Sequence, residues 1–98
     1  MQPLADLDRI LENRIRLAIM AVLASGERVD FISLRRMLGT SDGNLATHAG
    51  VLERAGYVQV RKGFLGRKTQ TTYGATEKGR RAFARHVDAL ERLLRAGR

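Results

Sequence analysis

The sequence predicts a mainly helical α+β domain in which one two-stranded hairpin precedes a long C-terminal helix. Three observations predict it. Apolar residues recur at helical spacing in four segments, and one further segment alternates between apolar and polar residues and is rich in β-branched side chains. The excess positive charge falls on that segment and after it. With 98 residues and 44% hydrophobic content, we expect one domain, residues 1–98, with a core mostly of Leu, Ile, Val and Ala.

The N-terminal segment, residues 1–24, predicts a helical region from about residue 4 to residue 24. We interpret Asn13 as a break between a short leading helix and a longer one. Ser25-Gly26 closes the region, because Gly adopts the positive φ of a helix C-terminus. The apolar face comprises Leu7, Ile10, Leu11, Ile15, Ala18, Ile19, Val22 and Leu23.

Residues 30–56 predict two helices joined by a three-residue turn, the arrangement of a helix-turn-helix. After a short strand at Val29, Asp30 caps a helix that Gly39 ends. Ser41 then caps a helix over residues 42–55. Its apolar stripe consists of Leu45, Ala49 and Leu52.

A hairpin is expected over residues 57–75. Residues 57–62 alternate and residues 69–73 have high β-propensity, so both are predicted strands, with residues 63–67 as a loop between them. Thr76 then caps a last helix, which ends near residue 96.

The net charge of +8 is concentrated in the C-terminal half. Residues 57–75 carry four basic side chains and no acidic one, and residues 76–98 carry seven basic and three acidic. Such asymmetry favours a polyanionic partner, although a basic surface can also serve solubility alone.

Several blocks of the chain together resemble a known family. They read N-R-I-R-L-A-I at 13–19, S-D-G-N-L at 41–45, E-R-A-G-Y-V at 53–58 and G-R-K-T-Q-T-T-Y at 66–73. In this order they resemble single-domain winged helix-turn-helix regulators of the ArsR/MarR type. The resemblance implies a homodimer that binds double-stranded DNA, with residues 42–55 as recognition helix, the basic hairpin as wing and residues 76–96 as dimerisation helix.

The predicted recognition helix presents a polar face opposite its apolar stripe. Its first turns would enter the major groove, where Asn reads adenine and Thr offers a hydroxyl and a methyl group. The alternative is an ordinary solvated helix face. Candidate DNA-binding residues of the helix-turn-helix are Arg35, Arg36, Ser41, Gly43, Asn44, Thr47, His48, Val51 and Arg54.

The wing would bind the DNA backbone and the minor groove, whose narrow, electronegative channel suits Arg. Its candidate residues are Arg61, Lys62, Arg67, Lys68 and Gln70. The alternative is a hairpin whose charges only prevent edge-to-edge aggregation. Phe64 and Leu65 at the tip could fold back, meet a partner subunit or contact DNA sugars, and the sequence leaves all three open.

The last helix carries a seam of Phe83, Val87, Leu90 and Leu94, spaced four, three and four residues apart. We predict that this seam, with Leu7 and Leu11, forms a homodimer interface. Its alternative role is to pack on the chain's own first helix.

No other class of site is favoured. The chain has no Cys, and its two histidines, His48 and His86, lack the clustered ligands of a metal site. We expect no metal, no cofactor and no enzymatic activity, since phosphate-cradling loops and nucleophile motifs are missing. Apolar runs are too short to span a membrane and no secretory signal is apparent, so a cytoplasmic, nucleoid-associated location is expected.

We therefore predict a homodimeric, sequence-specific transcriptional regulator that acts as a repressor. The alternative is a winged-helix protein-interaction module without specific DNA binding.

Overall fold

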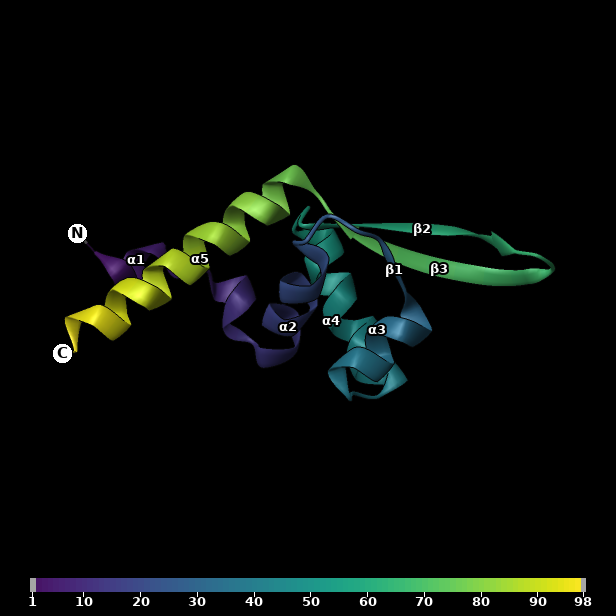
Figure 1. Cartoon of the computed structure of the whole chain (residues 1–98), viewed down its shortest axis with the longest axis horizontal. Coiled ribbons are helices and arrows are strands. Elements are labelled where there is room, and N and C mark those ends of the chain that lie inside the picture. Colours follow the sequence, from purple (N-terminus) through teal and green to yellow (C-terminus); the bar gives the residue numbers. More distant parts are fainter. Residues whose placement is uncertain (1, 98) are drawn as a thin grey trace.

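The computed structural model describes residues 2–97, and a central group of helices lies between two extensions that point in opposite directions (Figure 1). The hairpin forms one extension and the last helix forms the other, giving dimensions of 54 × 25 × 20 Å. In chain order the elements are α1 (Pro3–Asp6), the 3₁₀ turn η1 (Arg9–Glu12), α2 (Arg14–Leu23), β1 (Val29–Asp30), α3 (Phe31–Leu38), α4 (Asp42–Arg54), β2 (Val58–Leu65), β3 (Lys68–Ala75) and α5 (Glu77–Ala96).

The N-terminal region is more broken than the sequence predicts. The expected helix from residue 4 becomes α1 and η1, because the backbone is extended at Leu7 and again at Asn13. The Asn13 side chain accepts hydrogen bonds from the backbone N–H groups of Ile15 (2.9 Å) and Arg16 (3.1 Å). Asn13 thus begins α2, as predicted. Asp8 begins η1 in the same way, because its carboxylate accepts a hydrogen bond from the Ile10 N–H at 2.8 Å.

The helix-turn-helix forms as predicted. The Asp30 carboxylate accepts from the Ser33 N–H at 3.0 Å and caps α3. Gly39 ends α3 with a φ of 63°, and the Ser41 hydroxyl accepts from the Asn44 N–H at 3.1 Å to cap α4.

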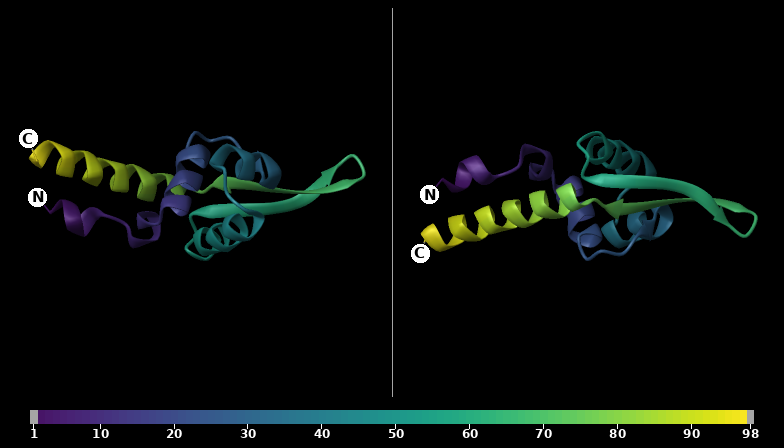
Figure 2. Two further views of the ribbon diagram at one scale, coloured as in Figure 1. Left: turned by 90° about the horizontal axis from the view of Figure 1, so that it is seen from below. Right: turned by 90° about the horizontal axis from the view of Figure 1, so that it is seen from above.

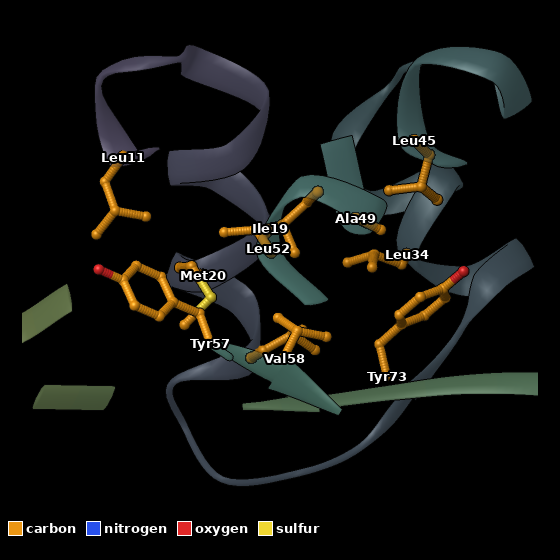
Figure 3. Packing of buried hydrophobic residues seen from close by; sticks show 11 residues of the cluster. Leu11, Ile19, Met20, Leu34, Leu45, Ala49, Leu52, Tyr57, Val58 and Tyr73 are labelled. Carbon is orange, nitrogen blue, oxygen red and sulfur yellow. The ribbon is translucent and has the colours of Figure 1, made fainter. Parts of the chain in front are cut away.

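The hydrophobic core lies between α2, α3, α4 and the base of the hairpin (Figure 3). Its fully buried large side chains are Leu11, Ile19, Met20, Leu23, Leu34, Leu45 and Leu52. The predicted apolar stripe of α4 is confirmed, because Leu45, Ala49 and Leu52 all face this core. Leu11 has no exposed surface, so its predicted place in a dimer interface is wrong: η1 turns its side chain into the protein's own core.

The sheet is antiparallel with strand order β1-β3-β2, and its hairpin is longer than the sequence predicts. Residues 63–65, expected in a loop, continue β2, and the ladder runs from Val58–Ala75 to Leu65–Lys68. Only Gly66 and Arg67 connect the strands. Gly66 has a φ of 65°, and glycine at this first loop position permits the tight two-residue turn.

The start of α5 is locked against the start of β2. Thr76 caps α5 by accepting from the Gly79 N–H at 3.0 Å, and its hydroxyl donates to the Gly56 carbonyl at 2.6 Å. A side chain at Gly79 would overlap the Tyr57 carbonyl, so the helix approaches β2 more closely there than any other residue would permit.

Candidate nucleic-acid interface

The exposed face of α4 carries most of the predicted base-reading residues. Gly43, Asn44, Thr47 and Arg54 are exposed there, and we call them the α4 face. Val51 is half-buried beside them. No atom outside the local backbone would lie within 4 Å of a Cβ at Gly43, so another molecule can approach the first turn closely.

Two other predicted contacts are already engaged within the chain. Arg35 Nε lies 2.9 Å from the Asp42 carboxylate, so this guanidinium braces the helix-turn-helix, while Arg36 is exposed. His48 Nδ1 accepts a hydrogen bond from Arg16 Nη1 at 2.9 Å, since arginine can only donate. Arg16 Nε also donates to the Ile10 carbonyl at 2.6 Å, which ties His48 to the N-terminal segment.

Arg14 is a cation that the sequence analysis did not select. It is exposed at the first position of α2 and lines a pocket of about 540 Å³ together with Ser41 and Asn44. The sequence did hold a signal for this position: the capping residue Asn13 indicates that Arg14, which follows it, lies at the N-terminus of a helix. Arg14 thus extends the positive charge of the interface alongside the turn between α3 and α4.

The wing cations are divided between the two faces of the hairpin. Side chains alternate along a strand, so Lys62 lies on the same face as the core residues Val58 and Val60, beside α4. Arg61 and Lys68 lie on the opposite face with the partly buried Gln70, and Arg67 is in the turn. All four cations are exposed.

A groove of about 420 Å³ separates α4 from the wing. Ala46 and Gly50 line it from α4, and Lys62 and Thr71 line it from the hairpin. Tyr73 also borders it, and burial, followed by the charge of Glu53, raises the pKa of this phenol. The groove shows that α4 and the Lys62 face of the wing are neighbours.

Arg28, which the sequence analysis also passed over, fastens the base of the hairpin. Its Nη2 donates to the carbonyls of Thr72 (2.9 Å) and Gln59 (3.1 Å). Gly74 provides the space, since a Cβ there would lie 2.6 Å from Arg28 Nη1. Burial lowers the pKa of Arg28, and nearby Arg61 adds to this effect. These hydrogen bonds join the residue before β1 to both strands of the hairpin.

The predicted seam on α5 is packed against the core at its start, through Phe83, and is exposed toward the end of the helix. Phe83 and Val87 are half-buried, whereas the exposed fraction of Leu90 is 36% and that of Leu94 is 69%. Leu7 is half-buried. The N-terminal segment runs beside α5, and both chain ends lie at the same end of the molecule (Figure 2).

Partly buried polar contacts hold that N-terminal segment on α5. His86 Nδ1 accepts from the Asp8 N–H at 2.9 Å, and the Tyr57 hydroxyl donates to the Asp8 carboxylate. Burial and this carboxylate raise the pKa of Tyr57 to about 12. Arg92 bonds Asp6 at 2.7 Å and holds the pKa of that carboxyl below its ordinary value. No local sequence signal indicates this network, because up to 86 residues separate its members.

Two features are absent from residues 2–97. No group of three His, Asp or Glu side chains in this range could hold a metal ion. None of its helices combines the length and apolar character needed to cross a membrane.

Comparison with known proteins yields a family match and several similar structures. The family described as winged helix DNA-binding domain matches residues 15–94. An uncharacterised protein of Methanocaldococcus jannaschii is 33% identical over 85 residues, which cover 87% of this chain and 92% of that protein.

Among solved structures, a transcriptional regulator homologue from Pyrococcus horikoshii OT3 is 28% identical, with a TM-score of 0.88 over 98% of this chain and 97% of that one. A MarR-family transcriptional regulator from Rhodococcus sp. RHA1 is 25% identical, with a TM-score of 0.58 over 93% of this chain and 69% of that one. The YusO protein of Bacillus subtilis, at 13% identity, shares the fold with a TM-score of 0.78 over 89% of this chain and 66% of that one.

Proposed function

The chain belongs to the winged helix DNA-binding domain family, and we propose that it binds specific sites in double-stranded DNA as a homodimer and represses transcription. The observation that carries the proposal is the groove flanked by α4 and the Lys62 face of an acid-free wing. Family membership agrees with the expectation of a DNA-binding protein rather than an enzyme.

The two parts of the interface have different tasks. The α4 face enters the major groove, where Asn44 and Thr47 contact base edges. Arg14, Arg36 and the wing cations, Arg67 at the turn among them, bind phosphates, and the wing lies along the minor groove. Ser41, Gly43, Val51, Arg54 and Gln70 remain proposed contacts; His48 supports α4 through Arg16 instead.

The homodimer is supported by the seam on α5. Two large apolar side chains of the seam, Leu90 and Leu94, are exposed on a protruding helix, and exposed apolar surface of this kind is typical of a protein–protein interface. Two copies joined there would present two α4 faces to one duplex. A bound dimer would block polymerase from DNA, which is the basis for proposing repression, and its place of action would be the nucleoid.

The first prediction concerns the symmetry of the binding site. Bound genomic fragments should share an inverted repeat whose half-sites lie about one helical turn, roughly 10 bp, or a small multiple apart, because a two-fold protein imposes its symmetry on DNA. Recovery and sequencing of bound fragments measures this. A shared motif without a dyad would contradict the dimeric mode of binding.

The second prediction separates the wing from α4. Arg67→Ala should weaken binding to specific and random DNA alike, and each lost phosphate contact should remove about 0.9 from the magnitude of the slope of log affinity against log salt. Asn44→Ala should leave that slope nearly intact and relax the preference at one or two base pairs per half-site, where a good bidentate contact contributes about 1–3 kcal/mol. Fluorescence anisotropy with operator and scrambled duplexes measures both.

Arg95→Ala is a matched control, since Arg95 is an exposed cation near the end of α5, paired with Glu91. Arg95→Ala should change neither the slope of log affinity against log salt nor the preference for operator over scrambled DNA. If Arg67→Ala and Asn44→Ala both behaved like wild type in slope and specificity, the assigned roles would be wrong. If neutralising the wing left DNA affinity untouched, a protein-docking role would be favoured instead.

A further inference from the structure

Two large apolar side chains stand exposed near the end of the wing. The exposed fraction of Phe64 is 75% and that of Leu65 is 68%. They occupy the last two pairs of the ladder, Phe64 with Thr69 and Leu65 with Lys68. Regular strand pairing holds their backbone, and the end of the hairpin extends beyond the helices (Figure 1).

Their positions in the strand separate the two side chains. Because neighbouring strand residues point to opposite faces, Phe64 shares a face with Lys62 and the core residue Val60. This is the face that borders the groove beside α4. Leu65 lies on the other face with Arg61. A duplex bound by the α4 face would therefore meet Phe64 rather than Leu65.

The charge around Phe64 identifies the kind of surface that it contacts. Residues 57–75 contain four cations and no acidic residue; Lys62 shares the face of Phe64, and Arg67 lies in the turn that follows Leu65. The complementary surface is thus apolar and bordered by negative charge. The DNA minor groove has this character, because sugar C–H groups and base edges line it between two rows of phosphates.

We propose that Phe64 enters the minor groove and packs against deoxyribose and base edges, while Lys62 on the same face and Arg67 in the turn bind the flanking phosphates. The inference rests on the proposed function and adds an apolar contact to it. Aromatic and aliphatic side chains at minor-groove interfaces wedge against base steps in this way. The contact displaces no counterion, so its contribution to affinity does not depend on salt.

The test compares full-length wild type, Phe64→Ser and the matched control Leu65→Ser. Anisotropy is measured on a random-sequence duplex of about three helical turns, roughly 30 bp, over a range of salt concentrations. Phe64→Ser should weaken binding about tenfold at every salt concentration, the order of magnitude of one aromatic contact to a base, with the slope unchanged. Leu65→Ser should change affinity by less than about twofold, since no groove contact is lost.

A second measurement locates the contact. Netropsin saturates the minor groove of an A·T-rich duplex, so wild type and Phe64→Ser should then bind that duplex with equal affinity. Both substitutions are at exposed positions, and thermal melting by circular dichroism should show folded proteins with wild-type transitions.

Four results would overturn the inference. They are equal affinities of wild type and Phe64→Ser, an equal loss for Leu65→Ser, a Phe64→Ser effect that netropsin leaves unchanged, and a Phe64→Ser effect on dimerisation without one on DNA, which would indicate a protein contact. Each leaves the proposed function intact. If wild type bound no duplex at all, the proposed function would fail together with the inference.

Discussion

Leu90→Asp is expected to yield folded monomers that bind operator DNA about 100- to 10,000-fold more weakly than wild type. The exposed fraction of Leu90 is already 36% in the single chain, so the fold tolerates a polar residue there. In a dimer the same position becomes buried, and an unpaired carboxylate at a buried apolar interface strongly opposes association. In a dimer, binding of one half-site holds the second subunit at a high effective concentration near the other half-site. A monomer contacts one half-site only and loses this gain in affinity.

Sedimentation and anisotropy at equal protein concentrations measure the two parts of this prediction. Met37→Asp is the matched control for oligomeric state and stability, because Met37 is an exposed apolar residue on α3, away from the seam. It should remain dimeric. A wild type that is strictly monomeric at tens of micromolar, roughly the range of a weak interface, would remove the dimer from the proposal.

Where local signals were strong, the sequence predicted the fold correctly. Asn13, Asp30, Ser41 and Thr76 each begin the helix expected of them, and Gly39 ends α3 with the predicted positive φ. A helix cap is a hydrogen bond between residues a few positions apart, so the local sequence is enough to predict it. The family blocks then placed α4 and the wing in order.

The errors arose where distant residues decide the structure. Gly63 and Gly66, which flank Phe64 and Leu65, indicated a loop. Gly63 instead continues β2, because Gln70 of β3 pairs with it, and Gly66 forms the tight turn. Leu11 lies on an apolar stripe that suits either a dimer interface, which we predicted, or a core. The break at Leu7 and the polar network of Asp8 with Tyr57 and His86 turned it inward, and no periodicity indicates such contacts.

The candidate site was predictable in its residue types but not in its geometry. The sequence identified the four wing cations, whereas only the strand register shows that Lys62 and Arg61 lie on opposite faces. Likewise, Arg35 and His48 have the chemistry of phosphate contacts, but Asp42 and Arg16 engage them within the chain. Arg14 and Arg28 belong to no motif that indicates a role. Their roles follow from the turn between α3 and α4 beside Arg14, and from the hairpin carbonyls that Arg28 bonds.

Gly79→Ala is expected to destabilise the protein by about 1–3 kcal/mol, even though alanine favours a helix by about 1 kcal/mol over glycine. The new methyl group would overlap the Tyr57 carbonyl and lie 3.0 Å from Met20 Cε. Met20 can move, but the Tyr57 carbonyl accepts the Thr76 N–H at 3.0 Å and is fixed at the start of β2. The steric cost therefore exceeds the gain in helix propensity.

Thermal and urea unfolding at one protein concentration measure the effect, which corresponds to a fall in Tm of about 4–8 °C for each kcal/mol. Gly43→Ala is the matched control in the first turn of α4, where no atom lies within 4 Å of the added Cβ, and it should be neutral or stabilising by up to about 1 kcal/mol. The contrast isolates packing from propensity. If Gly79→Ala were as stable as Gly43→Ala, α5 would not be held against β2 by this contact, and the Thr76 hydrogen bonds alone would set the angle between α5 and the wing.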